Sequence, residues 1–290
     1  MNVLIAGGTG LIGTAVRSRA SAAGHTVRLL VRREGRSGEY AWDPVAGVLP
    51  AEAIAWAEAI ISLNGATLTH FPWSATYRRT LRESRTGPTA LLATAIADSD
   101  SPPRVWVSGS AVGFYGDRPG ATLTEDSPAG TGFLAGLVEA WEAATRPAAD
   151  ATRVVWARTG LVLGPGGLAP LVRLARLGLA GPVGTGRQHW PWVSLADEVG
   201  ALVHLLGSTL AGPVNLVSPA AATAAEVTRA LAAAVHRPYL LPAPAWALRT
   251  LLGDAARDLL LADQHVLPAR LLADGYTFAA TDLAEAAATL

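Results

Sequence analysis

The sequence predicts an α/β fold in which a doubly wound parallel sheet carries a small, mostly helical C-terminal lobe. Apolar runs that suit buried strands alternate with helix-forming segments over the first 218 residues, and the first run ends in a glycine-rich turn. From about residue 223 the chain becomes rich in Ala and Leu. Because alternating strands and helices are typical of parallel sheets, we predict a sheet domain at 1–218 and a helical domain at 223–290, with loops at 164–193 contributing to the smaller lobe.

The strands of the sheet domain are expected where apolar residues run without interruption, as they do in strands that are buried on both faces. Residues 2–6 (NVLIA) form the clearest such run, and a helix at 11–23 follows the glycines. Further strands are expected at 26–31, at 40–43 as a short strand, and at 59–65, 104–109, 152–158 and 212–218.

Three more helices are expected in the sheet domain. The first spans 75–98, where Pro88 should kink or break it, because proline has no amide hydrogen and its ring clashes with the preceding turn. The second carries Trp141 and Glu142, between two predicted strands. The third lies near 195–206, after loops that are rich in Gly, Pro and Trp.

Charge and composition restrict the function. The 23 basic and 23 acidic residues balance and no polybasic run occurs, so we expect neither a nucleic-acid partner nor a membrane partner. There is no cysteine, which excludes disulfides and thiolate metal sites and favours a cytoplasmic location. The six histidines are scattered, so no metal site is expected. All 23 basic residues are arginine, and no mechanism here can use a lysine amine.

The N-terminal stretch MNVLIAGG is apolar, but it lacks a basic flank and runs straight into glycines, so it is not predicted to be a signal peptide. No uncharged apolar stretch reaches the roughly 18 residues that a membrane-spanning helix needs. Both observations support the prediction of a cytoplasmic protein.

The first predicted strand is followed by GGTGLIG, with Gly7, Gly10 and Gly13 at a spacing typical of dinucleotide-binding loops. In such loops the first glycine allows a tight turn, the second lets the backbone approach a pyrophosphate, and the third lets the helix pack on the strand. The helix N-terminus offers amide donors and the positive end of its dipole to the phosphates. We therefore predict that a dinucleotide binds here, with a purely structural glycine turn as the alternative. The residues of the loop are Gly7, Gly8, Thr9, Gly10, Leu11, Ile12 and Gly13.

The end of the second predicted strand indicates which dinucleotide binds. An acidic residue usually holds the adenine ribose about 20 residues past the loop. Here Arg32 and Arg33 stand at the end of that strand instead. A guanidinium suits a 2′-phosphate in charge and in bidentate geometry. The sequence therefore favours NADP(H) over NAD(H), with Arg32 at the phosphate; the alternative is a pair of solvated surface arginines.

Several motifs together carry a resemblance to a known family. Besides GGTGLIG they are SAVGFYGD, LTEDSP, RTGLVLGPGG, LGLAGPVGTGRQ and VLPARLLADGY, and the similarity runs over essentially all 290 residues. The chain resembles the extended, epimerase-like branch of the short-chain dehydrogenases/reductases, which implies a Rossmann-type sheet. More narrowly, it is similar to an atypical subgroup of the NAD-dependent epimerase/dehydratase family that carries a small C-terminal domain of unknown function.

The resemblance implies further contacts with the cofactor. Leu63, Asn64 and Gly65 in SLNGA would lie beside the adenosine and pyrophosphate, at the carboxyl end of a central strand. Arg85 in ESRTG and Arg158 in ARTG would also face the cofactor. Either arginine could be structural instead, and Arg158 has the better support from the residues themselves because it ends an apolar strand on the ligand side.

The resemblance also implies a catalytic set of serine, tyrosine and lysine, in which the tyrosine transfers the proton. Ser110 matches the serine, with one extra residue before FYG, but Phe133 occupies the place of the tyrosine and Leu137 that of the lysine. The usual acid–base pair is therefore predicted to be absent. Tyr115 is a candidate replacement acid, with packing at a turn as the favoured alternative. Ser110 is either a contact to substrate or nicotinamide or a simple strand-end serine.

Two more groups of residues have open roles. Asp117, Glu125 and Asp126 lie in predicted loops, where we expect them to be solvated rather than catalytic. The segment 184–199 resembles one that closes over the substrate in the family. Within it, Trp190 and Trp192 either line a pocket or pack in the core, since Trp is also a large core residue.

The sequence as a whole predicts an NADP(H)-binding, epimerase- or oxidoreductase-like protein that acts on an unidentified small molecule. Whether it is an enzyme stays open, because the usual acid–base pair is predicted to be absent. The alternative is a non-catalytic redox sensor or scaffold that reads the NADPH/NADP⁺ ratio, and a third reading is a structural fold with vestigial binding. Dimerisation through two helices is common in the superfamily, so the resemblance allows a homodimer.

Overall fold

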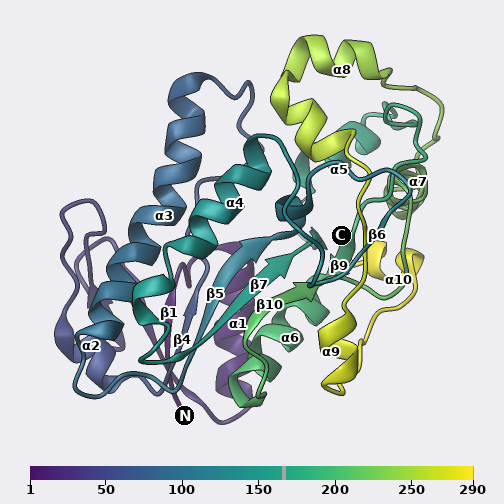
Figure 1. Ribbon diagram of the computed structural model, residues 1–290. Helices are drawn as coiled ribbons and strands as arrows, with labels where there is room; N and C mark the ends of the chain where they lie inside the picture. The colour runs from purple at the N-terminus through teal and green to yellow at the C-terminus, as the bar shows by residue number, and fades with distance from the viewer. Residues whose placement is uncertain (165–167, 290) are drawn as a thin grey trace.

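The computed structural model describes residues 1–164 and 168–289, and its centre is a sheet of seven parallel strands (Figure 1). The strand order is β10-β7-β5-β4-β1-β2-β3, so the chain reverses its direction of travel across the sheet between β1 and β4. This order confirms the predicted doubly wound, Rossmann-type sheet. The strands are β1 (Asn2–Ala6), β2 (Thr26–Val31), β3 (Glu39–Ala41), β4 (Ala59–Ser62), β5 (Val105–Ala111), β7 (Arg153–Thr159) and β10 (Gly212–Leu216).

Helices cover both faces of the sheet. On one face α1 (Leu11–Ala22) and α6 (Leu195–Gly207) pack against the strands through a single apolar cluster. On the other face lie α2 (Ala51–Trp56), α3 (Ala75–Ala97) and α4 (Phe133–Ala143), as Figure 1 shows. Because both faces are covered, the central strands are apolar on both sides, and this is why they appear in the sequence as unbroken apolar runs.

The helix α3 does not break at Pro88, so of the two expected outcomes, a kink or a break, the break is wrong. The helix continues from Ala75 to Ala97, and Pro88 is one of its buried residues. Buried side chains on both sides of the proline, Leu81 and Leu92 among them, hold the helix against its neighbours. Packing of this kind can outweigh the loss of one backbone hydrogen bond, because tertiary context routinely overrides local propensity.

The C-terminal lobe is small and mostly helical, as predicted, and it lies on the right of Figure 1. Its helices are α5 (Ala169–Arg176), α7 (Ala224–Ala234), α8 (Ala245–Leu252), the π-helix η3 (Ala256–Leu260), α9 (Ala269–Ala273) and α10 (Leu283–Ala287). Two short parallel pairs accompany them: β6 (Thr122–Leu123) with β11 (His265–Val266), and β8 (Leu161–Leu163) with β9 (Trp192–Ser194). Residues 165–167 of the predicted loop 164–193 lie outside the described residues. The domain boundaries stay a prediction.

Short 3₁₀ turns complete the chain, and one of them has a bearing on the site. The turn η1 (Val112–Tyr115) leads directly out of β5, and η2 (Arg146–Ala148) follows α4.

Within residues 1–164 and 168–289, no helix combines the length and the apolar character that crossing a bilayer requires.

Candidate functional site

The glycine-rich loop between β1 and α1 has the backbone shape that a phosphate-binding turn requires. Gly7 has a φ of +81°, and a Cβ atom there would lie 2.7 Å from the carbonyl oxygen of Leu63. A Cβ atom on Gly13 would overlap the oxygen of Gly7 and lie 2.7 Å from the Cα atom of Gly8. Gly7 therefore makes the tight turn, and Gly13 allows α1 to pack against the loop.

Gly10 differs from these glycines because its open side faces away from the protein. A Cβ atom on Gly10 would have no nearer neighbour than the oxygen of Gly7 at 3.5 Å. Gly10 is also the N-cap of α1, where no side chain caps the helix and no acidic residue lies in the first turn. The backbone N–H groups of the first turn have no partners within the helix. A space lined by backbone and uncapped amides fits a phosphate group. Thr9 and Leu11 are exposed beside it, and Ile12 is half-buried.

The two arginines at the end of β2 have different surroundings. Arg33 donates both terminal nitrogens to the carboxylate of Glu39 at 2.7 Å. Arg32 is exposed, and none of the residues that the structure describes forms an ion pair with it. Of the two, Arg32 is therefore the guanidinium that an anionic ligand can reach.

The chain leaves β4 at Ser62, and the next residues form the second wall of the loop. The side-chain oxygen Oδ1 of Asn64 is buried and has no hydrogen-bond partner. Gly65 lies against Arg85, because a Cβ atom on Gly65 would come within 2.9 Å of the guanidinium carbon. The structure thus brings Leu63 and Asn64 to Gly7, with Gly65 next in the chain, at the point between β1 and β4 where the strand order reverses. Ligands of doubly wound sheets bind in this crevice.

Arg85 is a buried cation that bonds only to neutral groups. Its side chain donates to the carbonyl oxygens of Leu81 and Ala66, at 3.0 and 3.1 Å. It also lies 5.3 Å from the ring of Trp141. Burial lowers the pKa of Arg85 to about 10, so the side chain keeps its charge at neutral pH. Its positive charge is not compensated by a carboxylate among the described residues.

Ser110 belongs to a buried polar network at the carboxyl end of β5. The strand register pairs Ser110 with Arg158 of β7, so both side chains lie on the same face, toward α4. There Glu142 accepts a hydrogen bond from Ser110 Oγ at 2.6 Å and two from Arg158 at 2.8 and 2.9 Å. The register continues from Arg158 to Asn215 of β10, which accepts a bond from Tyr115 at 2.7 Å.

The side chain of Arg158 is bound within this network and does not face an open cleft. It is 3 % exposed, and besides Glu142 it donates to the hydroxyl of Tyr115 at 3.1 Å. The ring of Phe114 covers its guanidinium, whose carbon lies 3.5 Å from the ring centroid. The predicted contact between Arg158 and the cofactor stays a prediction, and this geometry favours the structural alternative.

Tyr115 is sealed in the interior, with none of its surface exposed. Burial raises the pKa of Tyr115 above its ordinary value, and the opposing effect of Arg158 does not reverse this shift. An acid that works near neutral pH needs its pKa moved the other way. The environment therefore favours the alternative in which Tyr115 packs at the turn η1.

Apolar residues surround the positions that resemble those of the family's tyrosine and lysine. Phe133 starts α4 and meets the ring of Trp73 edge-on, with centroids 5.6 Å apart. Leu137 is 2 % exposed in the same cluster, which also includes Leu252 and Leu259 of the C-terminal lobe. These positions form a packed apolar cluster under that lobe.

The sequence did not indicate which carboxylates are buried, and Glu125 and Glu198 are two of them. Glu125, expected to be solvated, is 4 % exposed and accepts a bond from the backbone of Asn215 at 3.0 Å. That expectation is wrong, because the loop before α4 lies under the C-terminal lobe; Asp126 next to it is exposed. Glu198 of α6 is completely buried, accepts a bond from Thr159 at 2.8 Å and has one oxygen without a partner. Burial raises the pKa of Glu198 to about 8.

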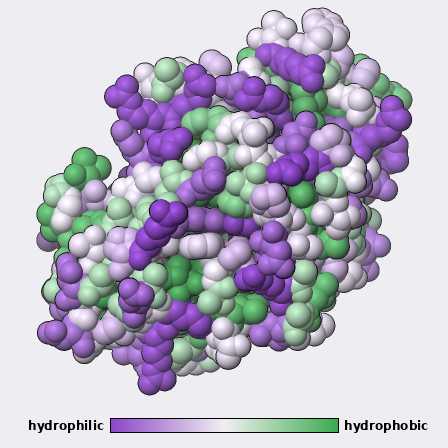
Figure 2. Space-filling view, viewed as in Figure 1, coloured by the Kyte–Doolittle hydropathy of each residue, from purple (hydrophilic) through white to green (hydrophobic). Residues whose placement is uncertain are grey.

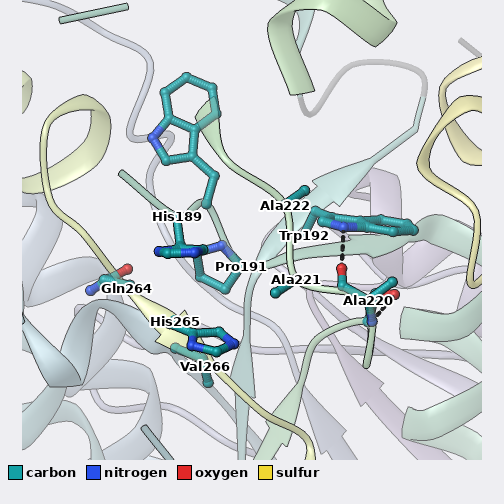
Figure 3. Close-up of a pocket in the computed structure, with 11 residues that line it drawn as sticks. His189, Pro191, Trp192, Ala220, Ala221, Ala222, Gln264, His265 and Val266 are labelled. Atoms are coloured by element: carbon teal, nitrogen blue, oxygen red, sulfur yellow. Dashed lines mark hydrogen bonds between the residues drawn. The ribbon is translucent and has the colours of Figure 1, made fainter. Parts of the chain in front are cut away.

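Trp190 and Trp192 pack in the C-terminal lobe. They are 4 % and 1 % exposed, and their indole nitrogens donate to the carbonyl oxygens of Leu260 and Ala220. They border a depression that does not admit a water molecule, where the rings of His189 and His265 stack with centroids 4.8 Å apart (Figure 3). Both tryptophans thus act as core residues that also border this small depression.

Metal ligands are not gathered anywhere in the described part of the chain. No three His, Asp or Glu side chains lie close enough together to hold a metal ion there.

Two family models match the chain. The model of the NAD-dependent epimerase/dehydratase family matches residues 3–218. A domain of unknown function matches residues 243–290.

Whole-length relatives and a solved structure agree with these matches. An epimerase family protein of Mycobacterium tuberculosis is 42 % identical over 289 residues, covering 98 % of this chain and 95 % of the relative. The human epimerase family protein SDR39U1 is 38 % identical over 292 residues, covering 99 % and 98 %. A crystal structure of that human protein with NADPH superposes with a TM-score of 0.90 at 36 % identity, covering 99 % of this chain and 98 % of the human one.

Proposed function

The chain belongs to the NAD-dependent epimerase/dehydratase family, and from this membership and its loop geometry we propose that it binds NADPH at the switch point of the sheet. Its substrate would be a small molecule, and its chemistry would be epimerase- or oxidoreductase-like. The observation that carries the proposal is the loop itself, in which Gly7 and Gly13 are held tightly while Gly10 faces open space before an uncapped helix. The human relative crystallised with NADPH supports the choice of cofactor.

The residues around the glycine-rich loop offer groups that suit such a cofactor. The amides at the start of α1 would hold the pyrophosphate, and the unpartnered Oδ1 of Asn64 would accept a hydrogen bond from the ligand. Arg85, which lies against Gly65, adds an uncompensated positive charge beside a ligand that is strongly anionic. When bound, NADPH supplies a hydride, and the protein supplies binding, orientation and exclusion of water.

The preference for NADPH over NADH would rest on Arg32. This side chain is exposed and free of ion pairs with the described residues, whereas Arg33 is already held by Glu39. A charged hydrogen bond to the 2′-phosphate contributes about 1.5–3 kcal/mol, which corresponds to roughly 10- to 150-fold in affinity. NADH has no such phosphate and would gain nothing from Arg32.

Titration of the cofactors into Arg32→Ala and Arg33→Ala tests the proposal. We expect Arg32→Ala to weaken NADPH binding by about 10- to 100-fold and to leave NADH binding unchanged, because only the phosphate contact is lost. Arg33→Ala, the matched control, should change NADPH affinity much less. If the unmodified protein binds neither nucleotide, the whole proposal is wrong. If NADPH affinity falls equally in both variants, Arg32 has no specific role.

The buried network suggests how Ser110 would act. Its hydroxyl hydrogen points to Glu142, so Ser110 can offer only a lone pair to a ligand. A neighbouring group of the substrate or of the nicotinamide amide would then have to be the donor. Phe133 and Leu137 have no proton to give, so any proton transfer would use a group of the substrate, a water molecule or another side chain.

The second candidate function is a sensor that binds NADP(H) without turnover. The apolar cluster of Phe133, Trp73 and Leu137 favours it, because this cluster occupies the positions that resemble the family's acid–base pair. The two functions are separated by following NADPH absorbance with aldehydes and ketones of graded size. Steady oxidation of NADPH with any of them supports an enzyme. Saturable binding of NADPH without oxidation by the whole panel supports the sensor.

A further inference from the structure

The C-terminal lobe exposes an unusual concentration of large apolar side chains. Eight of the twelve exposed large hydrophobic residues in the described chain belong to it, and seven of these eight lie between residues 174 and 251. The seven are Leu174, Leu177, Leu179, Leu240, Leu241, Trp246 and Leu251. Trp246, Leu240 and Leu251 are 72–73 % exposed, and α8, which carries two of these three, has no buried residue. We call these seven residues, together with the six arginines named below, the lobe face.

The two segments that carry these residues lie side by side. The backbone amides of Leu240 and Leu241 both donate to the carbonyl oxygen of Ala180, at 2.9 and 3.0 Å. A third bond joins Ala243 to Pro182, just before α8 begins. The segment that follows α5 and the stretch before α8 therefore run side by side. In Figure 2 green hydrophobic residues lie among purple ones at the upper right, over α8.

All charged residues of the lobe face are positive. The stretches 159–196 and 227–253 contain no Asp or Glu. They contain six arginines, all exposed and none in an ion pair with a described residue: Arg173, Arg176, Arg187, Arg229, Arg237 and Arg249. The acidic residues that flank the second stretch are engaged elsewhere. Glu226 caps α7 with Thr223, and Asp254 pairs with Arg78 and Arg257.

We propose that the lobe face docks on an anionic lipid bilayer. Exposed Leu and Trp side chains that project from a helix suit the boundary between headgroups and acyl chains, and arginines around them suit anionic headgroups. A second copy of the chain is the poorer occupant, because a symmetric pair would bring the same arginines together without a counter-charge. Large exposed apolar patches with a charged rim mark interaction sites.

The sequence alone predicts no membrane partner, because it contains no polybasic run. The arginines of the lobe face are spread over two segments that are more than forty residues apart between Arg187 and Arg229. Only the fold brings these segments together, and the surface that results could not be seen as a run. The docking is peripheral, which is consistent with the absence of a membrane-crossing helix in the described ranges.

Co-sedimentation of the full chain with vesicles tests this inference. One set of vesicles is phosphatidylcholine alone, and the other contains added phosphatidylserine. We expect binding to the anionic vesicles that weakens as salt is raised, and little binding to phosphatidylcholine. Arg173→Gln with Arg176→Gln should lower binding by about 10- to 30-fold, and Trp246→Ala should lower it as well.

The matched control is Arg79→Gln with Arg82→Gln, an exposed pair at the same spacing on α3. It should bind anionic vesicles as the unmodified protein does, and the thermal transition of each variant shows that it is folded. Equal binding to both kinds of vesicle, no binding to either, or an equal loss in the control overturns the proposal. A dimer that Trp246→Ala dissociates would assign the lobe face to a second copy instead.

Discussion

Single buried charges shape the interior of this protein. Glu142 gathers Arg158 and Ser110 at the carboxyl ends of β5 and β7, and the three form a closed set of charge-assisted bonds. Glu198 lies on the opposite face of the sheet, where Thr159 is its only hydrogen-bond partner among the described residues. The two environments differ because successive residues of β7, Arg158 and Thr159, point to opposite faces. One carboxylate lies against the guanidinium of Arg158, and burial without a cation raises the pKa of the other.

Replacing Glu142 with Ala should strongly destabilise the fold. Arg158 is 3 % exposed and would keep its charge without a carboxylate partner. Breaking a buried ion pair in this way lowers the free energy of unfolding by about 3–5 kcal/mol. Chemical denaturation measures this as a lower free energy of unfolding. Glu139→Ala, on the exposed side of the same helix, should change that free energy by less than about 0.5 kcal/mol. A small loss in Glu142→Ala would mean that water replaces the carboxylate.

The carboxyl group of Glu198 should make stability depend on pH. Burial raises its pKa from an ordinary value of 4.5 to about 8 in the folded protein. Between these values the unfolded chain releases the proton and the folded protein keeps it, so the free energy of unfolding falls as pH rises from 4.5 to about 8. Glu198→Gln cannot ionise and should flatten this part of the stability profile, which denaturation at a series of pH values would show. Glu139→Gln should retain the slope of the unmodified protein.

At the scale of elements, the β1–α1 unit would combine a structural role with the proposed binding of the cofactor. Gly7 and Gly13 are required by the protein itself, since a Cβ atom at either position would collide with backbone atoms. Gly10 would be required only by the proposed cofactor, because the space beside it is open and its φ of −76° suits any residue. The same spacing of glycines thus contains two kinds of requirement, which sequence alone does not separate.

Alanine substitutions separate these requirements. Gly10→Ala should leave the thermal stability of the ligand-free protein unchanged and abolish NADPH binding, because the new methyl group enters the phosphate space. Gly13→Ala should lower stability even without ligand, since its Cβ atom collides with the loop. Gly87→Ala in α3, where nothing lies within 4 Å, is the control and should stabilise the protein by about 0.5–1 kcal/mol. Calorimetry with and without NADPH measures all three, and NADPH binding by Gly10→Ala would contradict the proposed site.

At the scale of the whole molecule, the C-terminal lobe completes elements of the sheet domain. The helix α4 begins after Gly132, which has no side chain to cap it. Asp258 of the lobe supplies the cap instead and accepts a bond from the amide of Leu134 at 3.1 Å. Arg78 of α3 pairs with Asp254 of the lobe at 2.6 Å, so the lobe is held against two helices of the sheet domain.

Asp258→Ala should weaken the junction between the two parts of the molecule. Loss of an N-cap costs about 0.5–2 kcal/mol, and here it also removes a contact between segments that are distant in the chain. We expect a lower thermal transition and faster hydrogen exchange at the first amides of α4. Asp100→Ala, in an exposed loop, is the control and should change neither. Unchanged exchange at α4 in Asp258→Ala would show that water caps the helix equally well.

The sequence by itself determined the features that short-range patterns encode. Unbroken apolar runs predicted the strands, because a strand covered on both faces has no polar side. The glycine spacing at the end of the first strand predicted the loop, and the arginines after β2 favoured NADP(H). The motifs placed the chain in its family. Each of these signals is contained in a stretch of about ten residues.

Only the tertiary structure decided how distant residues meet. It showed that α3 continues through Pro88, that Glu125 is buried, that Arg158 is bound to Glu142, and that arginines from two segments share the lobe face. The physical reason is the same in each case. Burial, ion pairing and surface charge depend on which segments pack together, and strand register and helix packing set this over separations of tens of residues.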